Sequence, residues 1–271
     1  MTEEEIAACF PNLQCVFYAA GTVQPFARPF LARGVQVFSA WAANAIPVAE
    51  YTVSQIILAN KGFFRTAWPN SVGDLAQAKH HKKAICGNYG AKIGIIGAGM
   101  IGKLVIRLLK AYNLQTVTFD PFLPEEAAKE LGTEKVTLEE LFATCQVVSN
   151  HLANNEATKG MLTGKHFASM PPYATFLNTG RGAQVRDEEL QDVLAERSDL
   201  TAVLDVTYPE PPEEGSRFYS LPNVILTPHI AGSMGNEFYR MSEYMLEEFR
   251  LWKNAAPTRY GVTEKMLETM A

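Results

Sequence analysis

The sequence predicts an α/β protein with a doubly wound parallel sheet and a second, smaller domain. A glycine-rich turn follows a short apolar β-type run, and strand-like and helix-like runs alternate after it. Two further strand-like runs stand near the start of the chain, ahead of a long helix-like segment. Alternation at this spacing is typical of parallel strands joined by crossover helices on both faces of a sheet. A chain of 271 residues is long enough for one large domain or two modest ones.

The first part of the chain contains elements of the smaller domain. Residues 14–20 and 35–38 are rich in β-forming side chains and predict two strands, joined by a helix around residues 26–32. Residues 47–61 have the composition of a long helix that opens with proline and ends just before Gly62. We expect this helix to pack on or between the domains.

The next segment has the spacing G-x-G-x-x-G directly after a predicted strand. The first glycine allows the tight strand-to-helix turn, the second leaves room for a pyrophosphate beside bare backbone, and the third lets the following helix pack closely on its strand. The free N–H groups at the start of that helix face the anion. The predicted dinucleotide-binding residues of this turn are Gly97, Gly99, Met100, Ile101 and Gly102.

A second β-rich strand, residues 115–119, is followed by Asp120. An acid at this point accepts hydrogen bonds from both adenosine ribose hydroxyls and repels a 2′-phosphate. Residues 121–123 contain no Arg or Lys that would receive such a phosphate, so the sequence predicts NAD rather than NADP. The alternative is a glycine-rich turn in some other α/β protein, which the strand, helix and acid in register disfavour.

The rest of the chain continues the alternation. The sequence predicts strands over residues 147–150, 174–178, 201–206 and 224–226, and helices over residues 100–109, 138–144, 187–196 and 237–253. The last helix is amphipathic and is expected to return to the smaller domain. The predicted dinucleotide-binding domain therefore covers residues 48–232, and the predicted substrate domain covers residues 1–47 and 233–271.

Composition argues against several classes of protein. The chain is 47% hydrophobic and 20% charged, its net charge is −5, and no apolar run reaches the length of a membrane span. Its acidic start is unlike a signal peptide. We therefore expect a cytoplasmic protein without general affinity for nucleic acid or membrane. The one basic cluster, residues 79–83, is interpreted as a solvated loop.

Four cysteines are scattered along the chain without C-x-x-C spacing. This pattern predicts neither a zinc site nor a redox pair, and no metal is expected. The cysteines are interpreted as buried free thiols: Cys9, Cys15, Cys86 and Cys145.

Reactive side chains follow three of the late strands, at the edge where ligands bind in open α/β sheets. Arg181 can hold a substrate carboxylate with two hydrogen bonds and stabilise negative charge as a hydride arrives; the alternative is a surface salt bridge. His229 can donate a proton to the forming alkoxide, with Glu210 fixing which ring nitrogen faces the substrate. Taken singly, a histidine after proline is more often structural, and a glutamate between prolines is usually a loop residue.

The motifs together resemble the D-isomer-specific 2-hydroxyacid dehydrogenases, over nearly all of the chain. Members of that family join a glycine-rich NAD turn to Asn-x-x-Arg-Gly, Asp-Val-x-x-x-Glu-Pro and Pro-His-x-x-Gly segments in that order. The matching segments here are residues 97–102, 178–182, 205–211 and 228–232. Four motifs in order make the resemblance specific.

The resemblance implies a role for each matching residue. Arg181 would bind and polarise a 2-oxo acid, and Glu210 with His229 would form the acid/base pair. Asp205 would lie near the nicotinamide carboxamide. Further cofactor contacts would come from Thr179 and Gly232, and backbone N–H groups for the substrate carboxylate from Ala20, Gly21 and Thr22. The resemblance also implies a Rossmann nucleotide domain, a flavodoxin-like substrate domain and a homodimer formed through the nucleotide domain.

The chain departs from the family pattern in three ways. Family members usually have roughly two further βα units ahead of the point that matches Met1. The smaller domain is therefore expected to be N-terminally incomplete, with an uncovered sheet edge, low stability or an incomplete cleft. Val23 replaces a frequent acid, and Ala153 replaces a frequent proline. Trp41 either lines the substrate pocket or fills the interdomain core, and we favour the core.

Three functional hypotheses follow. The first is an NAD-dependent enzyme that reduces a small 2-oxo acid to a D-2-hydroxy acid. The others are a regulatory protein that binds NAD(H) and responds to it, and a vestigial NAD(H) binder without turnover. The presence of all three reactive side chains favours the enzyme, while the identity of its substrate stays open.

Overall fold

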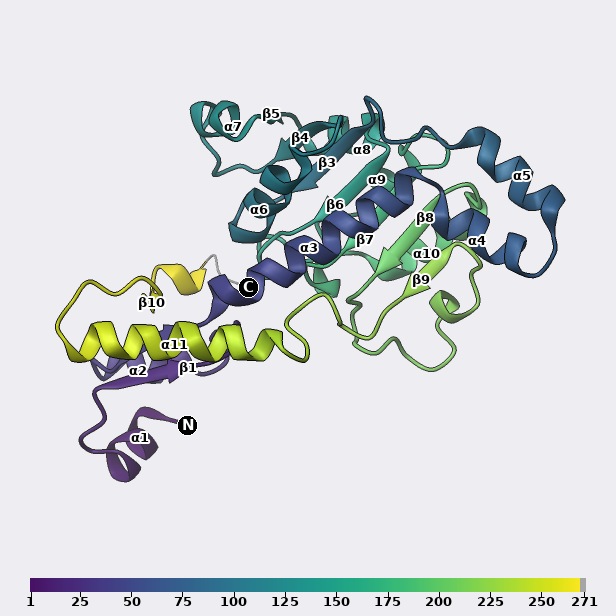
Figure 1. Cartoon of the computed structure of the whole chain (residues 1–271). Helices are drawn as coiled ribbons and strands as arrows, with labels where there is room; N and C mark the ends of the chain where they lie inside the picture. Colours follow the sequence, from purple (N-terminus) through teal and green to yellow (C-terminus); the bar gives the residue numbers. More distant parts are fainter. Residues whose placement is uncertain (269–271) are drawn as a thin grey trace. The chain divides into compact units, whose positions relative to one another are not determined.

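The structure, a computed structural model, describes residues 1–268 and divides into two compact units (Figure 1). Unit 1 comprises Met1–Pro47 together with the segment that begins at Gly232, and unit 2 comprises Val48–Ala231. Unit 2 is built on a seven-stranded sheet in the order β5-β4-β3-β6-β7-β8-β9, in which every pair of neighbours is parallel. The predicted doubly wound α/β fold is confirmed.

The strands of unit 2 follow the predicted alternation closely. They are β3 (Lys92–Ile96), β4 (Gln115–Phe119), β5 (Glu134–Lys135), β6 (Val147–Asn150), β7 (Thr175–Asn178), β8 (Thr201–Leu204) and β9 (Val224–Leu226). The strand order reverses between β3 and β6, which is where ligands bind in open α/β sheets. All carboxyl ends of these parallel strands meet at one edge, so the residues that follow them share that edge.

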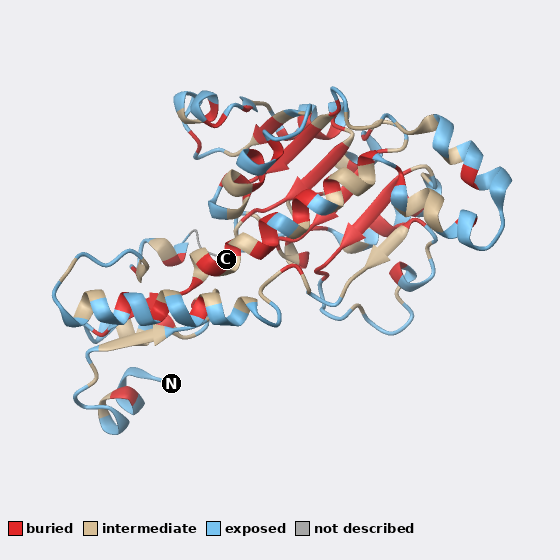
Figure 2. Ribbon diagram, viewed as in Figure 1, coloured by how far each residue is buried: buried red, intermediate tan, exposed pale blue. Residues whose placement is uncertain are grey.

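Helices cover both faces of this sheet. They are α3 (Trp41–Asn60), α6 (Met100–Leu109), α7 (Glu125–Leu131), α8 (Leu138–Thr144), α9 (Gly164–Ala168) and α10 (Asp187–Glu196). Helices α4 (Phe63–Ser71) and α5 (Leu75–Ala84) follow α3 along the chain, and α5 packs on α4. Side chains from α3, α6 and α7 pack in one apolar cluster, and those from α8, α9 and α10 pack in another. Alternate strand residues enter the two clusters, as Val147 and Val148 do. Figure 2 shows the central strands buried between these layers.

Unit 1 contains a three-stranded sheet. In it β1 (Cys15–Tyr18) pairs in parallel with β2 (Gln36–Ser39), and β10 (Gly261–Val262) pairs with the other edge of β2 in the antiparallel sense. Its helices are α1 (Glu3–Cys9), α2 (Ala27–Ala32) and α11 (Glu237–Lys253). Met241 and Met245 of α11 pack with Phe38 of β2. Val23, one of the departures from the family pattern, is fully buried in the cluster around Val37.

Helix α3 begins six residues earlier than predicted, at Trp41, and Pro47 lies inside it. The predicted start at the proline was wrong because a proline inside a helix removes one backbone hydrogen bond without always ending the helix. Here Ala43, ahead of the proline, is buried in the cluster around Phe38, and this packing supports the first turns. Trp41 packs edge-to-face on Tyr260 within unit 1.

The basic cluster of residues 79–83 lies in helix α5 and not in a loop, so that interpretation was wrong. The carboxylate of Asp74 caps the helix by accepting a hydrogen bond from the Gln77 N–H at 3.0 Å. The last turn contains His81, Lys82 and Lys83. Positive charge at this end of a helix interacts favourably with the helix dipole. A run of basic residues is therefore compatible with the C-terminal part of a helix.

The cysteines differ in burial. Only Cys145 is buried among the four; Cys9 and Cys86 are exposed, so the prediction of buried thiols was wrong for these two. Burial raises the pKa of the Cys145 thiol to about 11. Within residues 1–268, no helix is long and apolar enough to cross a membrane. Among the same residues, no group of His, Cys, Asp and Glu side chains has an arrangement able to hold a metal ion.

Candidate functional site

The glycine turn after β3 has the geometry that a dinucleotide needs. Gly97 has a φ of +87°, and a Cβ there would lie 2.8 Å from the carbonyl oxygen of His151. A Cβ on Gly102 would collide with the carbonyl oxygen of Gly97. A Cβ on Gly99 would meet nothing within 4 Å, so the backbone there is open to a ligand at the start of the ten-residue helix α6. This open cradle fits a pyrophosphate.

Asp120 ties this turn to the loop after β4. Its Oδ2 accepts a hydrogen bond from the Ala98 N–H at 2.7 Å, and its Oδ1 accepts from the N–H groups of Phe122 at 2.7 Å and Leu123 at 3.1 Å. A carboxylate has about four acceptor positions, so one remains for a ribose hydroxyl. The predicted ribose-binding residue is therefore also an anchor for two loops.

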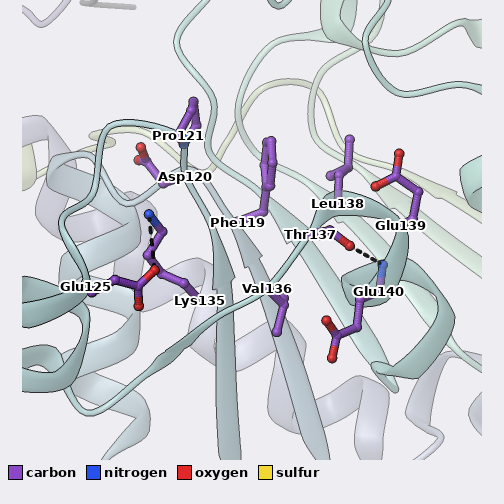
Figure 3. Close-up of a pocket in the computed structure, with 10 residues that line it drawn as sticks. All are labelled: Phe119, Asp120, Pro121, Glu125, Lys135, Val136, Thr137, Leu138, Glu139 and Glu140. Carbon is purple, nitrogen blue, oxygen red and sulfur yellow. Dashed lines mark hydrogen bonds and ion pairs between the residues drawn. The ribbon is translucent and has the colours of Figure 1, made fainter.

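An open pocket of about 560 Å³ lies beside Asp120 (Figure 3). It is lined by residues from the ends of β4 and β5 and from the starts of α7 and α8: Phe119, Asp120, Pro121, Glu125, Lys135, Val136, Thr137, Leu138, Glu139 and Glu140. Its position next to the glycine turn fits the adenosine half of NAD. The sequence did not identify Lys135, because it comes from a different strand than Asp120.

Arg181 follows β7 and is half-buried. Its guanidinium donates a hydrogen bond to the Gly180 carbonyl oxygen at 2.7 Å. Burial lowers the pKa of this guanidinium, and the negative charge of Glu210 acts in the opposite direction. The carboxylate of Glu210 therefore lies within electrostatic range of the Arg181 guanidinium.

Buried amides hold the segment that carries Arg181. The Asn150 side chain donates hydrogen bonds to Asn178 Oδ1 at 3.0 Å and to Gln184 Oε1 at 2.6 Å. Gln184 in turn donates to the carbonyl oxygens of Leu152 at 2.7 Å and Ala153 at 2.9 Å. Sequence reasoning missed Asn150 and Gln184. A polar residue at the end of an apolar strand was the available signal for Asn150.

His229 and Glu210 meet in the structure. The Nδ1 atom of His229 lies 2.6 Å from Glu210 Oε1, and both side chains are partly exposed. With Nδ1–H donating to the carboxylate, Nε2 is directed elsewhere and is available to a substrate. His229 has a φ of 55°, a left-handed conformation that is uncommon for a residue with a side chain.

Asp205 supports this conformation from the end of β8. Its side chain is 2% exposed and accepts hydrogen bonds from Thr227 Oγ1 at 2.6 Å, Ile230 N at 2.8 Å and Ala231 N at 2.9 Å. Because Thr227 Oγ1 donates to Asp205, it accepts from the hydroxyl of Tyr51 at 3.1 Å. Thr227 was not identified from the sequence.

The loop that carries Glu210 is held by two residues near β7. A Cβ on Gly182 would overlap the backbone of Thr207, so only glycine allows this approach. Asp187 accepts a hydrogen bond from the Tyr208 N–H at 3.2 Å. Burial raises the pKa of Asp187 to about 6.

The remaining predicted residues are divided between the two units. Thr179 is buried in unit 2, where its hydroxyl shares a hydrogen bond with Thr52 at 3.2 Å and lies 3.3 Å from His151 Nδ1. Unit 1 contains Ala20, Gly21, Thr22 and Gly232, and the carbonyl oxygens of the first two lie 2.8 and 2.7 Å from the Ser39 hydroxyl.

A family profile described as "D-isomer specific 2-hydroxyacid dehydrogenase, NAD binding domain" matches residues 56–231. The chain belongs to this family. The resemblance predicted from four sequence motifs is confirmed, and so is NAD as the cofactor.

Similar proteins include members of this family with different substrates in their names. YoaD of Bacillus subtilis, whose name places it among the 2-hydroxyacid dehydrogenases, is 35% identical over 211 residues, which are 74% of this chain and 59% of that protein. The D-3-phosphoglycerate dehydrogenase of Archaeoglobus fulgidus is 26% identical over 87% of this chain and 44% of its own length. The chain therefore spans less than two thirds of these relatives.

Solved structures share the fold. The D-mandelate dehydrogenase of Rhodotorula graminis in its holo form matches with a TM-score of 0.82 at 22% identity, over 97% of this chain and 79% of that one. The TT0316 protein of Thermus thermophilus matches with a TM-score of 0.72 at 26% identity, over 96% and 82% of the two chains.

Proposed function

We propose that this protein catalyses the reversible, NAD-dependent reduction of a small 2-oxo acid to a D-2-hydroxy acid. The observation that carries the proposal is the 2.6 Å contact between His229 and Glu210, whose charge also acts on the half-buried cation of Arg181. All three residues follow strands of the same parallel sheet that carries the glycine turn. A base, its carboxylate partner and an anion-binding cation are the groups that this reaction needs.

The residues divide the work of the reaction. NADH, when bound, would supply a hydride for the carbonyl carbon. Arg181 binds the substrate carboxylate and stabilises the negative charge that develops on the carbonyl oxygen. His229 donates a proton from Nε2 to that oxygen, and Glu210 stabilises the ring through Nδ1. In the reverse direction, His229 takes the proton back.

We also propose the roles of the other predicted residues. Gly97, Gly99, Met100, Ile101 and Gly102 would bind the pyrophosphate, Asp120 the ribose, and Thr179, Asp205 and Gly232 the nicotinamide half. In the smaller domain, Ala20, Gly21 and Thr22 would offer N–H groups to the substrate carboxylate. Residues 48–232 would form the dinucleotide domain, and residues 1–47 with 233–271 the substrate domain; the profile match over residues 56–231 supports the first of these.

The test is the loss of NADH absorbance when the purified chain is given 2-oxo acids of increasing size, from glyoxylate to bulky and phosphorylated compounds. His229→Ala should lower turnover about 10²–10⁴-fold while NADH affinity, titrated by fluorescence, stays within about twofold. His80→Ala, on the exposed surface of α5, is the matched control. Full activity of His229→Ala would contradict the mechanism. NADH binding without turnover in the unchanged chain would favour an NAD(H)-binding regulatory or vestigial protein.

A homodimer through unit 2 is a further part of the proposal. Helices α4 and α5 and the turn between them expose large apolar side chains: Phe63, Trp68, Val72 and Leu75. An exposed apolar surface of this kind is typical of an interface between subunits. Light scattering should give twice the chain mass, and Trp68→Glu should halve it; a monomeric unchanged chain would contradict the proposal.

A further inference from the structure

The charged residues that line the pocket beside Asp120 are four acids and one lysine. Asp120, Glu125, Glu139 and Glu140 contribute carboxylates, and Lys135 contributes the cation (Figure 3). The inference below rests on the proposed NAD binding, which places the adenosine ribose at Asp120. A 2′-phosphate on that ribose would enter this pocket.

Lys135 is fixed in place by its contacts. Its Nζ atom donates a hydrogen bond to the Leu123 carbonyl oxygen at 2.6 Å and lies 3.8 Å from Glu125 Oε1. Its side chain is 23% exposed, whereas that of Glu125 is 68% exposed. An ammonium group that is held this firmly has little conformational entropy left to lose when it binds an anion.

Lys135 and Asp120 hold the same turn through the two backbone groups of Leu123. Asp120 accepts from the N–H of Leu123, and Lys135 donates to the carbonyl oxygen of that residue. The position of the Asp120 carboxylate, and therefore of the ribose hydroxyl that it would bind, depends on both contacts. Loss of either one should loosen the turn.

The sequence alone indicates that no cation is available to a 2′-phosphate, because residues 121–123 contain none. The fold changes this conclusion. Strand β5 pairs with β4 in parallel, so Lys135 enters the pocket from the neighbouring strand. An ammonium has three donors, and the Leu123 carbonyl oxygen accepts from one of them at 2.6 Å. Glu125 Oε1, at 3.8 Å, forms an ion pair that is too long for a hydrogen bond.

We propose that Lys135 determines the cofactor preference of this pocket together with Asp120. In the natural chain Lys135 positions the Asp120 turn for the ribose of NAD. When the carboxylate of Asp120 is removed, the same ammonium becomes the binding group for the 2′-phosphate of NADP. The acid, and not the lack of a cation, is what excludes NADP.

The experiment measures NADH and NADPH affinity by fluorescence titration of the full chain, without turnover. The variants are Asp120→Asn, Lys135→Met and the double variant, with Lys129→Met as the matched control. Lys129 lies on α7, is 71% exposed and pairs with Glu126 outside the pocket lining. Asp120→Ser, which keeps a hydroxyl acceptor for the turn, repeats the test if the asparagine variant melts at a lower temperature.

Asp120→Asn should raise NADPH affinity about tenfold, and adding Lys135→Met should remove that gain. Lys135→Met alone should weaken NADH binding about threefold or more, while Lys129→Met leaves both affinities unchanged. The proposal is overturned if the double variant keeps the NADPH gain, or if Lys135→Met binds NADH as the control does. Failure of the natural chain to bind NADH would instead overturn the proposed function itself, and this inference with it.

Discussion

The carbonyl oxygen of Asp205 accepts a hydrogen bond from the His229 backbone N–H at 3.1 Å, while the carboxylate of Asp205 binds the next two N–H groups of the same loop. One buried residue thus holds three consecutive peptide groups. Left-handed backbone costs roughly 1–3 kcal/mol at a residue with a side chain and persists only where the surroundings fix it. Asp205 supplies that constraint for His229.

Asp205→Asn should therefore weaken both fold and activity. The amide NH₂ would face at least one of the N–H groups that the carboxylate now accepts, which leaves a buried donor unpaired. We expect a loss of about 1–3 kcal/mol in the free energy of unfolding, measured with urea, and lower turnover. Asp192→Asn, which breaks an exposed pair with Arg217, is the control and should change stability by less than about 1 kcal/mol. Equal effects of the two variants would contradict the anchoring role.

Glu210→Gln should lower turnover with little change in NADH affinity. Glutamine can still accept a hydrogen bond from His229, but it cannot stabilise the positive charge that the ring carries before it donates its proton. We expect a fall of at least about tenfold in kcat. Glu213→Gln, an exposed glutamate of the same loop, is the matched control. If both variants keep full kcat, Glu210 has no part in proton transfer.

His151 should make the fold sensitive to acid. Burial lowers its pKa from 6.5 to about 3 in the folded chain, while Ser149 and Thr179 hydroxyls lie at its two ring nitrogens. In the unfolded chain His151 binds a proton below about pH 6.5, whereas in the folded chain it does so only below about pH 3. Stability should therefore fall as pH falls through this range, by up to about 1.4 kcal/mol per pH unit.

The measurement is the free energy of unfolding against pH for the natural chain and for His151→Gln. The variant should lose this part of the slope, whereas His80→Gln, with an exposed ring, should keep it. The comparison is between variants because Asp187 acts in the opposite sense. Its pKa is raised to about 6 in the folded chain, so its contribution to stability increases as pH falls from about 6 towards its ordinary value. Parallel curves for natural chain and His151→Gln would refute the assignment.

Gly182→Ala should displace the loop that carries Glu210. The added methyl group would overlap the backbone of Thr207, which is itself buried. We expect a loss of about 1–3 kcal/mol in stability together with reduced turnover. Gly261→Ala, whose methyl group would lie 3.6 Å from Phe38, is the control and should be nearly silent. A normally active Gly182→Ala protein would show that the loop can move without cost.

Much of the fold could be predicted from the sequence because its helices and strands show clear hydrophobic periodicity and end at recognisable turn residues. The helix at Met100–Leu109 and the strand at Gln115–Phe119 have the bounds that apolar spacing and the glycine turn predict. Helix α5 was missed because its positive charges and few apolar residues give no helical stripe. The start of α3 was missed because packing, which a sequence does not display, outweighs the effect of Pro47.

Some residues of the candidate site could be found from the sequence, and others could not. Arg181, Glu210 and His229 were found because their chemistry is local to each strand end. Their supports were missed because they act through contacts between distant segments, such as Asn150 with Gln184 and Lys135 with Leu123. No spacing along the chain marks such pairs.

The bond from the Ala98 N–H to Asp120 has a consequence for how this protein can be altered. Asp120, which is proposed to distinguish NAD from NADP, also holds the glycine turn that would bind the pyrophosphate. A change at Asp120 therefore affects both the choice between the two dinucleotides and the affinity for either of them. A single replacement at Asp120 that admits NADPH also weakens the hydrogen bonds that hold the cradle, so the looser cradle offsets part of the gain in NADPH affinity. A compensating change in the glycine turn would then be expected to restore the affinity that the looser cradle loses.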